Sequence, residues 1–219
     1  METPLAAPTR ILVVDDHPIV RLGIRQMIST DPALSVVAEA DSCAGAVRMA
    51  RAFAVDFAIV DLSLSDGSGL TAIRELTGII PGLPVLVLSM HDERLFAERV
   101  LRAGARGYIM KQEAIGHLLE GIHDVLAGHI HVSGQMSQSI LHRLGREGSI
   151  HEGELENLTD RELEVFEAIG RGMSTATIAA RLNVSIKTIE TYRSNIKTKL
   201  DLKDAADLIR HAATWIDGL

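Results

Sequence analysis

Four short apolar runs in this chain each end in a charged or polar residue, and this pattern limits the fold more than any other feature. The runs at residues 11–14 and 58–60 end in aspartates, whereas those at 85–88 and 107–110 end in a serine and a lysine. Short apolar runs of this kind indicate buried strands. In an open parallel sheet, ligands bind just beyond the carboxyl ends of the strands, so the four polar ends are expected to meet at one edge.

The polar residues at these strand ends are suited to binding phosphate and a divalent cation. They comprise three carboxylates, a hydroxyl and an ammonium group: Asp15, Asp16, Asp61, Ser89 and Lys111. Crowded carboxylates repel one another, and Mg²⁺ relieves this repulsion because it prefers carboxylate and phosphate oxygens. An aspartate can also attack phosphorus and form an aspartyl phosphate. The pattern therefore predicts phosphoryl transfer to Asp61, with Mg²⁺ and Lys111 supplying charge and Ser89 binding a phosphoryl oxygen.

The first half of the chain alternates apolar strands with amphipathic helices. Strands are expected near 11–14, 35–40, 55–60, 85–88 and 107–110, and helices near 20–29, 42–52, 70–76, 93–103 and 113–127. This alternation predicts an α/β domain over residues 10–127, with a parallel sheet and right-handed crossovers. Gly, Ser, Gln and His then become frequent, so residues 128–154 are expected to form a linker, with a short helix at 134–144.

From residue 155 onward the sequence favours helices alone. Thr159 and Glu162 have the spacing of a capping box, in which each side chain bonds the other residue's backbone at the start of a helix. Ser174 and Ser185 are expected to cap the next two helices, and a fourth follows residues 201–204. Two short helices joined by the tight turn at 183–184 are typical of a helix-turn-helix. Residues 155–219 are therefore predicted to form a small four-helix domain.

The third helix of that domain has a polar, basic side. Ile186, Ile189, Ile196 and Leu200 are expected to face mainly the core, and residues 185–200 hold four basic residues against one acidic residue, a net charge of +3. Such a helix fits the major groove of DNA. The residues expected to contact DNA are Lys187, Thr188, Glu190, Thr191, Arg193, Ser194 and Lys197. Candidates for base contacts are Lys187, Glu190, Thr191 and Ser194, while Lys and Arg side chains are expected on phosphates.

Composition argues against several other classes of protein. With 47% hydrophobic and 23% charged residues among 219, the chain is expected to be globular. No apolar run approaches the ~20 residues of a membrane span, and the first ten residues lack the order of a signal peptide. Cys43 is the only cysteine, which fits a reducing cytoplasm. The net charge of −7 argues against indiscriminate nucleic-acid binding. The nine histidines, including His123, His129 and His131, lack zinc-site spacing and are expected to be solvated.

Both halves together resemble a bacterial two-component response regulator of the NarL/FixJ type. Residues 10–127 resemble its receiver domain, which implies the flavodoxin-like strand order 2-1-3-4-5, and residues 156–216 resemble a LuxR-type helix-turn-helix. The residues that carry the resemblance are Asp15, Asp16, Asp61, Ser89, Tyr108 and Lys111, together with the stretches 158–162 and 189–196. One departure is Ser65, because the family often has proline at this position, four residues after the phosphoacceptor.

The resemblance implies a role for each of these residues. Asp61 is the phosphoacceptor, Ser89 and Tyr108 form a switch, and the Mg²⁺ ligands are Asp15, Asp16, Asp61 and the backbone carbonyl of Ser63. The implied partners are a sensor histidine kinase as phosphoryl donor, promoter DNA half-sites bound by a homodimer, and RNA polymerase, with no membrane. The resemblance implies a regulator, not an enzyme.

Two alternative functions are open at this point. The first is a receiver-type regulator that acts without phosphorylation; the intact acidic pair and Lys111 argue against it. The second is a Mg²⁺-dependent phosphohydrolase that uses Asp61 as a covalent nucleophile. The loop after Asp61 holds no general base to drive rapid hydrolysis, which argues against this function.

Overall fold

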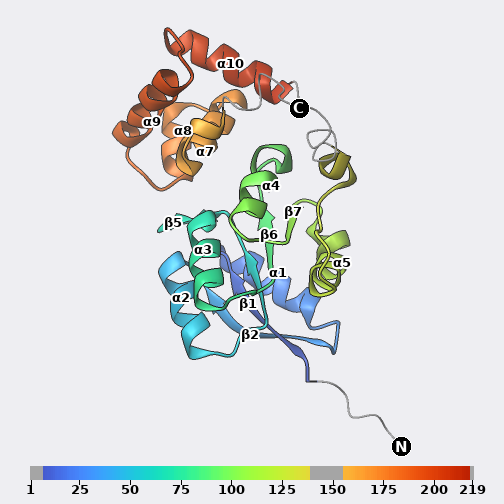
Figure 1. Ribbon diagram of the computed structural model, residues 1–219. Coiled ribbons are helices and arrows are strands. Elements are labelled where there is room, and N and C mark those ends of the chain that lie inside the picture. The colour runs from blue at the N-terminus through green and yellow to red at the C-terminus, as the bar shows by residue number, and fades with distance from the viewer. Residues whose placement is uncertain (1–6, 139–154, 218–219) are drawn as a thin grey trace, which may run out of the picture. The chain divides into compact units, whose positions relative to one another are not determined.

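The protein is described by a computed structural model that covers residues 7–138 and 155–217 (Figure 1). The chain divides into two compact units, Met1–Gln138 and Ser139–Leu219. Each unit has its own secondary structure: the first combines strands and helices, and the described part of the second contains helices only.

The first unit is built on a sheet of five parallel strands. These are β1 (Thr9–Val14), β2 (Leu34–Ala40), β3 (Phe57–Val60), β6 (Val85–Ser89) and β7 (Gly107–Met110). Their spatial order is β2-β1-β3-β6-β7, which confirms the order 2-1-3-4-5 implied by the resemblance. Every neighbouring pair is parallel, and Val14 lies opposite Val60 in the register. The carboxyl ends of β1 and β3 therefore lie side by side.

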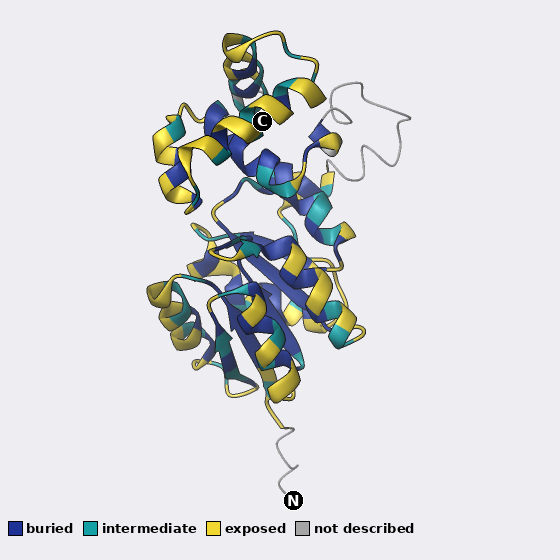
Figure 2. Ribbon diagram, turned by 90° about the vertical axis from the view of Figure 1, so that its left-hand side faces the viewer, coloured by how far each residue is buried: buried dark blue, intermediate teal, exposed yellow. Residues whose placement is uncertain are grey.

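Five helices cover the sheet: α1 (Pro18–Ile28), α2 (Cys43–Ala52), α3 (Gly69–Ile79), α4 (Glu93–Arg102) and α5 (Ala114–Leu126). Helices α1 and α5 pack on one face, where Ile24, Ile28, Leu118 and Ile122 join the sheet side chains in one core. Helices α2 and α3 lie together on the opposite face (Figure 1). Figure 2 shows the strands as buried and the outward sides of the helices as exposed. This layering leaves the carboxyl edge of the sheet to the loops.

A small antiparallel hairpin follows β3, which the sequence analysis did not predict. Its strands are β4 (Ser63–Leu64) and β5 (Gly67–Ser68), so Ser65 lies in its turn. The Asp66 carboxylate accepts hydrogen bonds from the N–H groups of Cys43 and Ala44 at 2.8 and 3.1 Å. Burial opposes the charge of Asp66, but these donors outweigh it and lower its pKa. The loop that lacks the family's proline is thereby tied to the start of α2.

Beyond α5 the chain returns along the edge of the sheet. His131 forms an isolated parallel bridge with Gly107 of β7, and residues 134–138 are helical. These residues belong to the first unit, although they lie within the range 128–154 predicted as a linker. Residues 139–154 of that range, including the last part of the helix expected at 134–144, lie outside the described residues.

The second unit begins with a 3₁₀ turn, η1 (Leu155–Asn157), followed by α7 (Asp160–Gly170), α8 (Thr175–Arg181), α9 (Ile186–Lys199) and α10 (Ala205–Asp217). The predicted capping box of Thr159 and Glu162 is present, and Ser174 and Ser185 cap α8 and α9. Apolar side chains from all four helices are buried: Phe166, Ile178, Ile189, Ile196, Leu208 and Ala212. These helices form the predicted helix-turn-helix arrangement.

Candidate functional site

The backbone positions of Asp15, Asp61 and Lys111 are fixed by hydrogen bonds that continue the sheet beyond its strands. The N–H of Asp15 donates to Ala40 O at 3.0 Å, and that of Asp61 donates to Val14 O at 2.8 Å. The N–H of Lys111 donates to Ser89 O at 2.8 Å. Each residue follows a buried strand, so the ladder carries all three to the same edge, as the sequence analysis expected.

Gly69 allows the loop after β3 to fold back closely on Asp61. A Cβ atom at residue 69 would lie 2.1 Å from the carbonyl oxygen of Asp61, far inside contact distance. The N–H of Gly69 donates to Leu62 O at 2.8 Å, which closes the loop. Glycine is therefore required here by the close approach of two backbone segments.

The side chains of these residues form a buried charge cluster. Lys111 Nζ lies 2.7 Å from Asp15 Oδ2 and 2.6 Å from Asp61 Oδ2, and both carboxylates are at most 2% exposed. Burial raises the pKa of Asp61 to about 6, with Lys111 opposing the rise and Asp15 adding to it. Burial also opposes the charge of Lys111, but Asp61 and Asp15 outweigh it and raise the pKa of the amine. One ammonium group thus lies between two buried carboxylates.

The acidic side of this cluster fits a cation. One ligand atom from each of Asp15, Asp16, His17 and Asp61 lies within 4.8 Å of the others. Asp15 Oδ2 and Asp16 Oδ1 are buried, and neither accepts a well-aligned hydrogen bond from the described residues, although Lys111 and His17 lie close by as ion-pair partners. Buried oxygens of this kind are the donor set that a hard divalent cation prefers.

The two residues expected to form the switch lie in the same unit. Ser89 is fully buried at the end of β6, and its hydroxyl accepts a hydrogen bond from the N–H of His91 at 3.2 Å. Tyr108 on β7 is 1% exposed, and its hydroxyl donates to the carbonyl oxygen of His91 at 2.9 Å. Both side chains therefore contact the backbone of the same residue, in the loop that follows β6.

Sequence reasoning missed two histidines at this edge. His17 Nδ1 lies 2.6 Å from Asp16 Oδ1, and the N–H of His17 donates to Asp15 Oδ1 at 2.8 Å. His91 Nε2 is 2.9 Å from Ser63 Oγ, which links the loop after β3 to the loop after β6. The adjacency of His17 to the acidic pair was a usable signal, whereas the contact between residues 63 and 91 has no sequence signature.

The expected DNA-binding residues lie on α9. Lys187, Glu190, Thr191 and Ser194 are exposed, while Thr188, Arg193 and Lys197 are half-buried. The turn before α9 holds Asn183 at φ 51°, a left-handed conformation that asparagine tolerates. This turn joins α8 and α9 into a helix-turn-helix. The polar side of α9 is exposed to solvent.

Two features of α9 differ from the sequence analysis. Ile186, expected to face mainly the core, is 56% exposed, whereas Ile189 and Ile196 are fully buried. Ile186 is the first helical residue, and helical side chains lean toward the N-terminus, so its side chain extends past the packed part of the helix. Lys199 Nζ lies 2.6 Å from Glu162 Oε2 of the capping box, so this part of the basic charge stabilises the unit itself.

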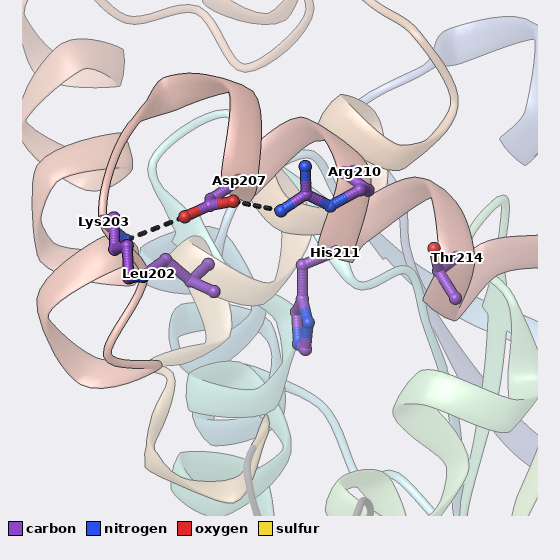
Figure 3. Close-up of a pocket in the computed structure, with 6 residues that line it drawn as sticks. All are labelled: Leu202, Lys203, Asp207, Arg210, His211 and Thr214. Atoms are coloured by element: carbon purple, nitrogen blue, oxygen red, sulfur yellow. Dashed lines mark hydrogen bonds and ion pairs between the residues drawn. The ribbon is translucent and has the colours of Figure 1, made fainter.

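A shallow hollow lies beside the start of α10 (Figure 3). It is lined by Leu202, Lys203, Asp207, Arg210, His211 and Thr214. The Asp207 carboxylate accepts a hydrogen bond from the N–H of Lys203 and forms an ion pair with Arg210. None of the six lining residues is among those expected to bind phosphate or DNA.

Each half of the chain matches a known protein family. Residues 11–123 match the family model of the response regulator receiver domain, and residues 156–212 match that of bacterial regulatory proteins of the luxR family. A putative transcriptional regulator of Pseudomonas aeruginosa is 37% identical over 93% of this chain and 97% of its own length. Oxygen regulatory protein NreC of Staphylococcus haemolyticus is 32% identical over 93% of this chain and 96% of its own.

A solved structure gives the same result. RcsB from Salmonella enterica serovar Typhimurium, bound to a promoter in the presence of the phosphomimetic BeF₃⁻, matches with a TM-score of 0.62 and 25% identity. The match covers 94% of this chain and 98% of that one. The fold and the site therefore define a DNA-binding transcriptional response regulator. Within that class, the chain belongs to the NarL/FixJ type, with a receiver domain followed by a LuxR-type helix-turn-helix domain, as the resemblance indicated.

In the two described ranges, no helix has the length and apolar character needed to span a membrane. His123 pairs with Asp31 at 2.7 Å and His131 with Asp124 at 2.8 Å, so these two imidazoles have separate partners. The expectation that the histidines are solvated is wrong for His91, which is 2% exposed, and for His131, whose side chain is 16% exposed.

Proposed function

We propose that this protein is a transcription regulator controlled by phosphorylation of Asp61. The observation that carries the proposal is the buried cluster in which Lys111 contacts both Asp15 and Asp61. The Asp61 carboxylate forms the new bond to phosphorus while the donor's bond to phosphorus breaks. A sensor histidine kinase is the expected donor, because the chain belongs to the response regulators.

The neighbouring residues stabilise the phosphorylated state. Lys111 donates to the phosphoryl oxygens once they replace the Asp61 oxygen as its partner. Asp15, Asp16, Asp61 and the backbone carbonyl of Ser63 would hold Mg²⁺, which when bound supplies positive charge beside the transferred group. Support comes from the buried oxygens of Asp15 and Asp16, which have Lys111 and His17 as ion-pair partners but accept no well-aligned hydrogen bond from the described residues.

Ser89 and Tyr108 transmit the change. In this proposal the Ser89 hydroxyl donates to a phosphoryl oxygen, and the loop that carries His91, to which the Tyr108 hydroxyl donates, moves with Ser89 and shifts Tyr108. Phosphorylation acts only by stabilising one of two conformations more than the other. Support comes from the shared contact of both side chains with the backbone of His91.

The output is DNA binding by a homodimer in the cytoplasm. The exposed residues Lys187, Glu190, Thr191 and Ser194 are candidates for base contacts, and Thr188, Arg193 and Lys197 complete the DNA-facing set. Relatives with similar structures support a dimer, since one is described as RcsB dimers bound to DNA, at 25% identity and a TM-score of 0.58. RNA polymerase is the expected partner of the DNA-bound protein.

Intact mass spectrometry tests the phosphoryl-accepting role. The protein is incubated with Mg²⁺ and a small phosphodonor such as acetyl phosphate, beside the Asp61→Asn variant. The expected result is one phosphoryl group on the parent and none on the variant, with Asp66→Asn, five residues further on, still accepting one. Equal labelling of the parent and Asp61→Asn would rule out Asp61 as the acceptor.

Analytical ultracentrifugation tests the coupling to dimer formation. Unphosphorylated protein is expected to be mainly monomeric, and phosphorylated protein mainly dimeric. An equally tight dimer in Asp61→Asn and in phosphorylated protein would contradict this part of the proposal.

A further inference from the structure

The edge of the receiver sheet is closed by the segment that follows α5. β7 is an edge strand, so its outer N–H and C=O groups need partners. The N–H of His131 donates to Arg106 O at 3.0 Å, and the N–H of Tyr108 donates to His131 O at 2.8 Å. A single residue, His131, thus takes the place of a sixth strand beside Tyr108.

The side chain of His131 packs closely against α5. A Cβ atom at Gly121 on α5 would lie 3.1 Å from His131 Cδ2, and one at Gly107 would lie 3.0 Å from His131 O. His131 Nδ1 lies 2.8 Å from Asp124 Oδ2, and the imidazole is only 16% exposed. Gly107 and Gly121 therefore leave room for His131 beside β7 and α5, and Asp124 pairs with its imidazole.

The same short segment also contacts α4. The N–H of Ser133 donates to Glu93 Oε1 at 2.8 Å, and Glu93 is the buried first residue of α4. Ser133 then starts the helical residues 134–138, since its hydroxyl accepts from the N–H of Met136 at 3.1 Å. Residues 131–133 thereby contact β7, α5 and α4 at once.

We propose that residues 131–133 form a latch that couples the state of Tyr108 and α4 to the chain leading into the DNA-binding domain. This inference rests on the proposed phosphorylation of Asp61. Tyr108 bonds His91 through its hydroxyl and His131 through its backbone N–H, so it joins the loop after Ser89 to the latch. A shift of Tyr108 or of the start of α4 therefore loosens residues 131–133. The closed latch restrains DNA binding, and phosphorylation opens it.

Hydrogen–deuterium exchange on the full chain tests the latch. Adding beryllofluoride and Mg²⁺ is expected to speed exchange in peptides covering residues 129–138 by about tenfold, which corresponds to about 1.4 kcal/mol of opening free energy. Asp61→Asn should show no such change. Faster exchange at the start of α4 with unchanged exchange in 129–138 overturns the latch alone. A protein that shows no change anywhere and takes up no phosphoryl group overturns both the latch and the proposed function.

Two matched variants on α5 separate the latch from general effects on the helix. Gly121→Ala places a methyl group 2.7 Å from Ile109 Cδ1 and 3.1 Å from His131 Cδ2, whereas a Cβ at Gly116 would meet nothing within 4 Å. Gly121→Ala is expected to speed exchange in residues 129–138 of unphosphorylated protein, while Gly116→Ala leaves it unchanged. Asp124→Ala removes the partner of His131 without crowding Ile109, so the same faster exchange in this variant assigns the effect to His131.

DNA binding is measured on a duplex selected from a random library by the beryllofluoride-treated protein. Unphosphorylated Gly121→Ala and Asp124→Ala should bind it at least about fivefold tighter than the parent, the lower end of typical coupling between sites. Gly116→Ala should bind like the parent. Equal affinity of all four proteins would overturn the restraining role of the latch.

Discussion

Burial opposes the charge of both Asp61 and Lys111, but only Asp61 loses in the balance with its neighbours. Burial disfavours the charge on each, but two carboxylates surround the lysine, whereas a single ammonium serves both Asp61 and Asp15. The amine therefore stays charged, and the pKa of Asp61 rises to about 6. A carboxylate that is under-compensated in this way gains from any cation or hydrogen-bond donor that reaches it.

Asp61→Asn is expected to stabilise the metal-free protein at pH 7.5. With a folded pKa of about 6 against an ordinary value of 3.8, Asp61 favours folding below pH 3.8, and this contribution is lost as the pH rises through 6. At pH 7.5 the charged carboxylate therefore costs up to about 3 kcal/mol, which asparagine removes. Urea denaturation in EDTA measures the difference, which should shrink at pH 5 and when Mg²⁺ is added. A gain of equal size at both pH values would contradict this explanation.

Lys111→Met is expected to destabilise the metal-free protein strongly. Removing the ammonium leaves two buried carboxylates without their cation, and breaking a buried pair costs about 3–5 kcal/mol. Denaturation at pH 7.5 measures the loss, and Mg²⁺ should restore part of it. Arg10→Met is the control, because the Arg10–Asp56 pair is exposed and should change stability little. An equal loss of stability in both variants would show that the burial of an ion pair does not set its contribution to stability.

At the scale of the helices, Glu162 both caps the start of α7 and joins α7 to the end of α9. Glu162 Oε2 accepts from the N–H of Thr159 at 2.7 Å and from Lys199 Nζ at 2.6 Å. Burial opposes the charge of Glu162, but these donors outweigh it and lower its pKa. The capping box is visible in the sequence because its residues are three apart. The ion pair to Lys199, which ties the end of α9 to the start of α7, spans 37 residues and is not.

Thr159→Ala is expected to weaken the start of α7. Losing the hydroxyl that accepts from the N–H of Glu162 typically costs about 1 kcal/mol. Hydrogen exchange of the first turn of α7 in the full chain measures the loss. Thr198→Ala, at an exposed position within α9, is the control and should leave that turn unchanged. Unchanged exchange in Thr159→Ala would show that the cap contributes little.

For the molecule as a whole, the distribution of charge matters more than its sum. The chain carries a net charge of −7, yet α9 is basic. Not all of that basic charge is available to DNA, because Lys199 pairs with Glu162 and Arg193 Nε lies 3.9 Å from Glu190 Oε2. DNA affinity is therefore expected to depend mainly on the exposed Lys187 and the half-buried Lys197 of α9.

Lys187→Ala and Lys199→Ala should accordingly differ in their effects. Lys187 is exposed, so its loss should weaken DNA binding and lower the slope of log affinity against log salt by about 1, without changing stability. Lys199→Ala should instead destabilise the C-terminal unit and leave the salt slope unchanged. Binding titrations at several salt concentrations, with denaturation of each variant, distinguish the two. Equal slopes for both variants would contradict the assignment.

Local pattern was enough to predict the order of elements and the ends of the strands. Residues 107–110 form a strand as predicted, and Thr159, Ser174 and Ser185 cap the predicted helices. The predicted ends of helices were less accurate where a residue outside the apolar pattern sets the end of the helix. α1 starts at Pro18, not residue 20, since proline suits the first turn of a helix. The hairpin after Asp61 was missed, because its strands have only two residues each.

The order of residues alone was enough to place carboxylates, a hydroxyl and a lysine after successive strands, and a basic helix after a capped turn. These features depend on neighbours a few residues apart, so periodicity and side-chain chemistry specify them. The folded structure was needed to show that Lys111 contacts both Asp15 and Asp61, that Ile186 faces solvent, and that His131 closes the edge of β7. Such contacts join residues far apart in the chain, and their geometry depends on sheet register and helix packing, which no local pattern encodes.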